Sequence, residues 1–156
     1  MIDHHNHYAR YNELMALAAA SAPSRQNDGG YMAAIYILAA DPELYKYTRP
    51  RIGSNGINFS GLLTAARRAG LSDSQIIAAR AAHNLFNGGS GNTTPYDLVQ
   101  CDYCTLDTIA DALYIWKGGR APSADGSGRM CLDRSAERHH RKFYAAFSQH
   151  LAAAED

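Results

Sequence analysis

Residues 31–40 decide the fold: Tyr31-Met32-Ala33-Ala34-Ile35-Tyr36-Ile37-Leu38-Ala39-Ala40. Alanine is the best helix former, and a helix that is apolar on nearly every face must be covered on every face. The run therefore predicts a central helix surrounded by other helices. Elsewhere alanine is frequent and Val99 is the only valine among 156 residues, so strands are not expected.

Helical signals precede and follow this run. Upstream, Asp3 can cap a helix that stops before Ala22-Pro23. Its apolar positions lie three and four residues apart: Tyr8, Tyr11, Leu14, Met15 and Ala18. Downstream, three helices are predicted from their caps and breakers: Asp41-Pro42 to Arg49-Pro50, Asn58 to Ala69-Gly70, and the capping box Ser72/Gln75 to Asn87-Gly88.

The remaining sequence predicts two more helices and a linker. A helix that stops at Gly118-Gly119 carries apolar residues at helical spacing: Leu106, Ile109, Leu113 and Trp116. Residues 118–130 are rich in Gly, Ser and Pro and predict a flexible linker. In residues 131–156, Ser135 can cap a basic helix with Phe143, Phe147 and Leu151 on one face. We predict an all-α protein: a compact single-domain bundle of five to seven helices over residues 4–117, with a separate C-terminal helix.

Composition limits the classes of binding partner and the cellular compartment that we expect. The formal net charge is zero, which argues against general binding to nucleic acid. No apolar run approaches the roughly 20 residues of a membrane span, and the N-terminus lacks the features of a signal peptide. Three cysteines do not make a disulfide framework. We therefore expect a cytoplasmic protein without a membrane partner.

The order of several motifs resembles that of a known group. These are Tyr11-Asn12-Glu13-Leu14, Ala34-Ile35-Tyr36-Ile37-Leu38 with Asp41-x-Glu43-Leu44-Tyr45, Ala82-x-Asn84-Leu85-Phe86-Asn87, and Thr94-Pro95-Tyr96-Asp97-Leu98. Across residues 8–117 the chain resembles a family of short proteins of unknown function from bacterial phages and mobile elements. The resemblance implies a phage-encoded protein in the cytoplasm of a bacterial host, and it transfers no catalytic residue.

Two sets of residues have the chemistry of metal ligands. Cys101, Cys104, Cys131 and His140 together provide the three thiolates and one imidazole of a tetrahedral zinc site. The alternative is three free thiols that pack as small apolar groups. His4 and His7 lie one turn apart beside His5, but we expect these histidines to be exposed to solvent on the first helical turn.

Two polar clusters and the tyrosines are candidates for binding. One helix face carries Arg80, His83 and Asn87, which could hold a phosphate or carboxylate. In the alternative interpretation, Asn87 acts as a structural cap and Asn84 forms a hydrogen bond with the backbone of a neighbouring loop. The basic cluster comprises Arg134, Arg138, His139, His140, Arg141 and Lys142. The tyrosines in or beside loops are Tyr45, Tyr47, Tyr96 and Tyr103.

The basic cluster predicts an acidic partner. Positive charge in the first half of a helix opposes the macrodipole, and Glu137 can offset one neighbour, at Arg141. An acidic surface on a host protein or a phosphate backbone would compensate for the remaining charge, and the alternative is a solvated face. The same helix could also pack on a second copy of the chain.

Common catalytic motifs are missing from the sequence. Gly88-Gly89-Ser90-Gly91 lacks the Lys-Ser or Lys-Thr of a phosphate-binding loop, and residues 58–61 lack the first glycine of a nucleophile elbow. We therefore expect a non-enzymatic binding protein that inhibits or occludes a host protein. The alternatives are a zinc-binding or nucleotide-handling enzyme and a protein that sequesters a nucleotide.

Overall fold

A computed structural model describes residues 6–88 and 93–154, with side chains as far as Phe147. The α-helices of these residues are α1 (His7–Ser21), α2 (Gly29–Ala40), α3 (Pro42–Thr48), α4 (Phe59–Arg68), α5 (Asp73–Asn87), α6 (Pro95–Leu98), α7 (Tyr103–Gly118) and α8 (Ser135–Ala154), and two short 3-10 helices span Pro23–Asn27 and Arg49–Arg51. Two antiparallel pairs of two-residue strands join β1 (Ile52–Gly53) to β2 (Gly56–Ile57) and β3 (Ser123–Ala124) to β4 (Met130–Cys131). The all-α prediction is confirmed.

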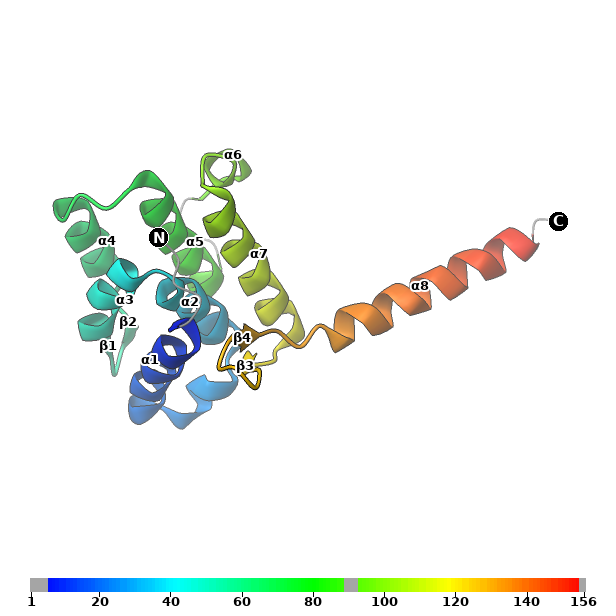
Figure 1. The fold of residues 1–156 in the computed structure, drawn as a ribbon, viewed down its shortest axis with the longest axis horizontal. Coiled ribbons are helices and arrows are strands. Elements are labelled where there is room, and N and C mark those ends of the chain that lie inside the picture. The colour runs from blue at the N-terminus through cyan, green and yellow to red at the C-terminus, as the bar shows by residue number, and fades with distance from the viewer. Residues whose placement is uncertain (1–5, 89–92, 155–156) are drawn as a thin grey trace.

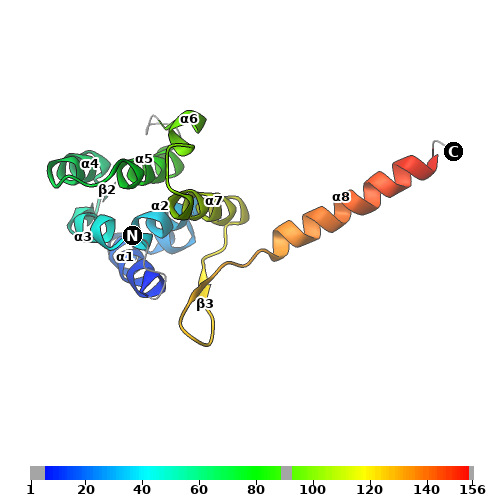
Figure 2. The same ribbon diagram turned by 45° about the horizontal axis from the view of Figure 1, so that its top comes forward.

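Helix α2 occupies the centre of the bundle, as its sequence predicts. Every residue from Tyr31 to Ala40 is buried. Helices α1, α5 and α7 pack against it, and Figures 1 and 2 show it between α1 on one side and α5 on the other. Its alanines, among them Ala33, Ala34 and Ala39, are fully buried, which lets the neighbouring backbones approach closely.

The helix ends follow the local signals. The Asp28 side chain accepts a hydrogen bond from the Tyr31 amide and starts α2. The predicted capping box of Ser72 and Gln75 starts α5. Gly88 ends α5 and Gly119 ends α7, with φ angles of 64° and 62°, a left-handed conformation that favours glycine.

The N-terminal region differs from the sequence prediction. Helix α1 follows Asn6, whereas Asp3, His4 and His5 lie outside the described residues. The predicted exposure of His7 is wrong: only 3% of this residue is exposed. Because α1 packs across α2, the His7 Nε2 atom lies 2.8 Å from the Tyr36 carbonyl oxygen, within hydrogen-bonding distance. Arg10 similarly donates hydrogen bonds to the carbonyls of Ala39 and Ala40 at the end of α2.

Two connecting segments contain more structure than predicted. The predicted linker 118–130 includes β3 and most of a hairpin, whose turn is held where the Asp125 carboxylate accepts hydrogen bonds from the amides of Ser127 and Arg129. The last helix begins at Ser135, the residue predicted as its cap, and Cys131 at the start of the predicted C-terminal segment belongs to β4. Residues 93 and 94 lead into the short helix α6, which Thr94 and Asp97 cap reciprocally and which the sequence analysis did not predict.

Helix α8 projects away from the bundle, starting near the C-terminal end of α7 (Figures 1 and 2). The expected separate C-terminal helix is therefore present. No described helix combines the length and the apolar composition that crossing a membrane requires.

Candidate protein-binding site

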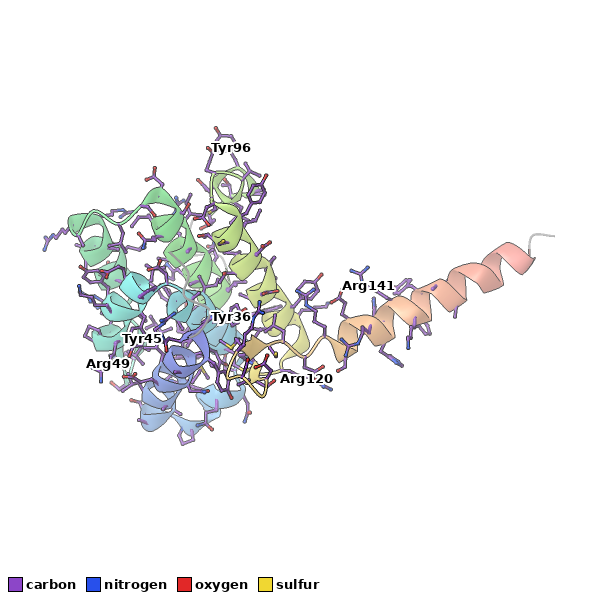
Figure 3. The ribbon with its side chains drawn as sticks, in the orientation of Figure 1. Tyr36, Tyr45, Arg49, Tyr96, Arg120 and Arg141 are labelled. Atoms are coloured by element: carbon purple, nitrogen blue, oxygen red, sulfur yellow. The ribbon has the colours of Figure 1, made fainter. Side chains whose placement is uncertain are left out.

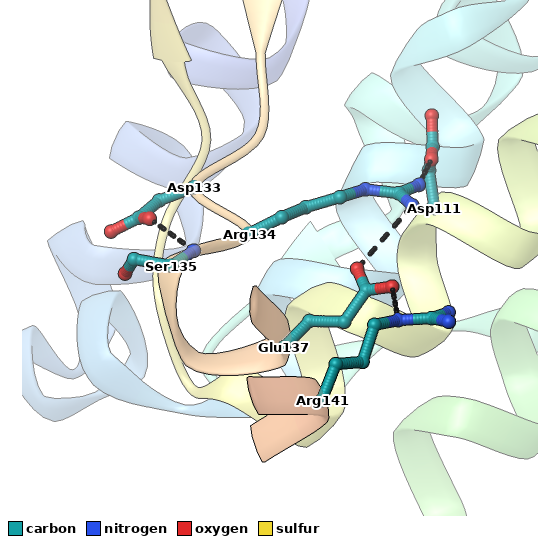
Figure 4. Close-up of polar contacts among 6 residues, drawn as sticks. All are labelled: Asp111, Asp133, Arg134, Ser135, Glu137 and Arg141. Atoms are coloured by element: carbon teal, nitrogen blue, oxygen red, sulfur yellow. Dashed lines mark hydrogen bonds and ion pairs between the residues drawn. The ribbon is translucent and has the colours of Figure 1, made fainter. Parts of the chain in front are cut away.

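The carboxylate of Asp111 on α7 joins the central helix to the start of α8. One of its oxygens, Oδ2, accepts a hydrogen bond from the Tyr36 hydroxyl at 3.2 Å. The other, Oδ1, accepts one from the Arg134 guanidinium at 2.6 Å, as Figure 4 shows. Burial and the neighbouring Asp111 raise the pKa of Tyr36, so its hydroxyl stays protonated and can donate.

Arg134 connects this carboxylate to the first turns of α8. Its guanidinium lies over the Tyr114 ring, 4.1 Å from the centroid, and pairs with Glu137 at 3.5 Å. Glu137 also accepts a hydrogen bond from Arg141 at 2.8 Å. Glu137 thus contacts two arginines, whereas the sequence predicted only Arg141. Each partly exposed pair contributes little alone, but together they orient the start of α8.

A second group of contacts fixes the first residue of α8. The Asp133 carboxylate accepts a hydrogen bond from the Ser135 amide at 2.8 Å, so Asp133 satisfies a free N–H group at the start of the helix. Arg120 forms an ion pair with Asp133 and donates to the Ser135 hydroxyl at 3.1 Å. The hydrogen bonds from Ser135, followed by the one from Arg120, hold the pKa of Asp133 well below its usual range.

The α7–α8 junction forms a cavity of about 480 Å³ that is open to solvent. Tyr114 forms part of its wall, and Lys117 and His140 line it beside the ion pairs of Arg134 and Arg141. Lys117 makes no ion pair with any residue that the structure describes. The lining mixes acidic and basic side chains, and Arg134, Glu137 and Arg141 among them are paired with one another.

Helix α8 has two chemically different faces. An α-helix turns by about 100° per residue, so Arg138, Arg141 and Lys142 lie on one side. Phe143 and Phe147 lie on the opposite side and are 61% and 51% exposed. Arg138 and Lys142 make no ion pair within the described part of the chain, whereas Arg134 and Arg141 do. The predicted basic cluster therefore has two parts. Arg134 and Arg141 form ion pairs near the start of α8, whereas Arg138 and Lys142 form an open basic face.

The four candidate tyrosines do not form one surface. Tyr45 lies on α3 and Tyr96 on α6, at separate ends of the bundle in Figure 3. Tyr45 donates a hydrogen bond to Glu13 at 2.5 Å, and Tyr47 packs beneath the ammonium group of its neighbour on α3. Tyr96 and Tyr103 are strongly exposed, so only these two present open rings.

The predicted ligand-binding residues on α5 have partners within the protein. Arg80 lies 3.6 Å from the Asp97 carboxylate, and Asn87 Nδ2 lies 3.2 Å from His83 Nε2. The His83 ring stacks on Phe59, and burial lowers the pKa of His83, which favours the neutral imidazole. Asn84 donates a hydrogen bond to the Thr93 carbonyl, which agrees with its predicted bond to a loop backbone. The ligand site itself stays a prediction.

The predicted zinc ligands lie on different elements. Cys101 precedes α7, Cys104 is on α7, Cys131 is on β4 and His140 is on α8. Within residues 6–88 and 93–154, no three His, Cys, Asp or Glu side chains are placed to hold a metal ion. All three cysteines are free thiols. Zinc binding stays a prediction.

Sequence reasoning missed Asp111 and Tyr114, which position α8. Both are exposed or half-exposed on α7. The Tyr36 hydroxyl, in the middle of a largely apolar run, was the signal that a polar partner had to meet it. No family model, curated protein or solved structure matches the chain. The resemblance of residues 8–117 to phage proteins therefore also stays a prediction.

Proposed function

We propose that this chain is a non-enzymatic, phage-encoded binding protein that occludes an acidic surface of a bacterial host protein. The observation that carries the proposal is the open basic face of α8, where Arg138 and Lys142 are exposed on a helix that projects from the bundle. The proposed compartment is the host cytoplasm, where free cysteines persist as thiols.

The construction of α8 supports this role. Arg134 and Glu137 orient its first turns through Asp111, so the basic face is presented in a defined direction from the bundle. Opposite charges steer two proteins together and select the partner. The helix has a single acidic side chain, Glu137, between Ser135 and Ala154, so the face attracts carboxylates with little internal compensation.

The test compares two charge-reversed proteins as baits in a bacterial lysate. The bait variant Arg138→Glu/Lys142→Glu changes the open face, and the matched control Arg67→Glu/Arg68→Glu changes two exposed arginines of α4. We expect the wild type and the α4 variant to capture the same protein and the α8 variant to lose it. Mass spectrometry then identifies the protein, and binding is repeated with the purified partner at increasing salt, which should weaken it.

Equal capture by all three baits would overturn the role of α8. Failure of the wild type to bind any purified candidate, or a contact surface on the partner that is not acidic, would overturn the proposed function.

A further inference from the structure

A groove of about 500 Å³ lies between α4 and the C-terminal end of α3. Helices α3 and α4 pack side by side, as Figures 1 and 2 show. Gly61, Ala65 and Ala69 border the groove and, at intervals of four residues, form one row that runs to the end of α4. These side chains are too small to fill the space in front of Tyr47 and Arg51, which border the groove from the other side. The volume that remains is within the range of sites for small molecules.

A second row on α4 adds polar groups to the groove. Ser60, Thr64 and Arg68 are again four residues apart, and all three are exposed. The hydroxyl groups of Ser60 and Thr64 make no hydrogen bond with any residue that the structure describes. A hydroxyl can donate to an anion, and the planar guanidinium group of arginine matches two oxygens of a phosphate. Every polar side chain of this row can therefore donate to a bound anion.

The charges around the groove have one sign. Residues 44–72 contain five lysines and arginines and neither aspartate nor glutamate. Two of these cations have acidic partners from outside the segment, since Lys46 pairs with Glu43 and Arg49 pairs with Glu13. The cations that make no ion pair within the described part of the chain are Arg51, Arg67 and Arg68. Because none of the described residues that line the groove is acidic, an anion bound there would compensate for the unpaired charge.

Arg51 and Arg68 approach the groove from opposite ends of α4. The Arg51 carbonyl accepts a hydrogen bond from the Asn58 amide at the start of α4, at 2.9 Å. The Arg51 guanidinium donates to the Tyr47 carbonyl at 2.6 Å, which holds it beside the groove. Arg68 is the last residue of α4, roughly 15 Å further along the helix axis. Linked phosphates suit two separated cations better than a single phosphate does.

We propose that the groove between α3 and α4 binds a small molecule with linked phosphate groups, such as a nucleoside triphosphate or an inorganic polyphosphate. Arg51 and Arg68 bind phosphate oxygens through charge-assisted hydrogen bonds, and Ser60 and Thr64 donate to oxygens between them. The inference goes beyond the proposed function. In Figure 1 α4 lies on the far side of the bundle from α8, so either site can fail without the other.

The test is isothermal titration calorimetry of the full chain with three probes: tripolyphosphate, ATP and adenosine. We expect the wild type to bind at least one of the two phosphate probes with a dissociation constant below about 1 mM, and not to bind adenosine. Arg68→Gln should weaken this binding about tenfold or more, because it removes charge-assisted hydrogen bonds. Arg67→Gln is the matched control. It removes the same charge from the neighbouring residue of α4, which does not line the groove, and should change the affinity less than about twofold.

Thr64→Glu tests the groove without removing an arginine. Thr64 is exposed, so the variant should keep the circular dichroism spectrum of the wild type, while its carboxylate repels phosphate and weakens binding. Tighter binding of ATP than of tripolyphosphate identifies a nucleotide as the ligand, whereas equal or tighter binding of tripolyphosphate identifies the phosphate chain alone. Failure of both phosphate probes to bind, binding of adenosine as tight as that of ATP, unchanged affinity in Arg68→Gln or Thr64→Glu, or an equal loss in Arg67→Gln would each overturn the proposal.

Discussion

The Tyr36 hydroxyl donates a hydrogen bond to Asp111 across 3.2 Å, from the most deeply buried helix of the bundle to the helix that carries α8. The two residues are 75 positions apart in the chain. Because Asp111 also binds Arg134, the orientation of the projecting helix depends on a side chain in the core. Substitutions in the centre of the bundle should therefore change the orientation of α8 and of the binding surface on it.

Replacing Tyr36 with Phe should lower the free energy of unfolding by about 1 kcal/mol, since it removes one donor to Asp111. Tyr11→Phe is the matched control, because the buried Tyr11 hydroxyl has no hydrogen-bond partner among the described residues. That variant should be as stable as the wild type or slightly more stable. Urea unfolding followed by circular dichroism measures both, and equal losses would contradict the assignment.

Arg134→Gln should loosen α8 from the bundle. The change removes the ion pair with Asp111 and the contact with Tyr114, so amide hydrogen exchange in the first turns of α8 should accelerate about two- to fivefold, as expected for ~0.5–1 kcal/mol of partly exposed pairing. Arg138→Gln is the control, since Arg138 is exposed and unpaired within the described residues. Mass spectrometry of exchanged peptides reports both, and faster exchange in the control would contradict the prediction.

The stability of the bundle should fall in mild acid because of His83. Burial lowers the pKa of His83 below its usual 6.5, so the unfolded chain binds a proton more readily than the folded one. The contribution of neutral His83 to the free energy of unfolding is therefore fully present above pH 6.5. It is lost as the pH falls through the lower pKa of the folded state. Thermal unfolding at a series of pH values should show this decline.

The matched variants for this prediction are His83→Gln and His139→Gln. The first should flatten the dependence between pH 6.5 and the folded pKa, and the second, at an exposed histidine of α8, should not. An unchanged slope in His83→Gln would assign the decline to another group.

Enlarging Ala34 should destabilise the protein by about 1–3 kcal/mol, because the central helix has no space for a larger side chain. Ala34 is fully buried, whereas Ala16 of α1 is exposed. Ala34→Leu should therefore lower the urea midpoint, and Ala16→Leu should leave it nearly unchanged. A harmless Ala34→Leu would show that α2 is not tightly enclosed.

Local features of the sequence predicted the elements well. The burial of α2 followed from its composition, and the ends of α5 and α7 followed from Ser72, Gly88 and Gly119. Thr94 and Asp97 form the same kind of capping box at the start of α6, but no helix was predicted there. These features are legible because each depends on residues a few positions apart.

Contacts between distant segments were not predictable in the same way. Of the apolar row predicted for α7, Ile109 is buried, but Leu113 and Trp116 are exposed. The buried face instead includes Thr105 and Thr108. Thr108 satisfies its hydroxyl by donating to the Cys104 carbonyl within the helix, which makes a polar residue suitable for the interior. Hydrophobic spacing alone therefore identified the helix but not its buried side.

The enclosed position of α2 also has a consequence during translation. On the ribosome α2 is complete at Ala40, but the helix α7 that covers it ends only at Gly118, roughly 80 residues later. At about 5–20 residues per second, the side of α2 that α7 covers stays open for about 4 to 16 s. The element that gives the folded protein its core is thus, during translation, the segment most in need of a chaperone.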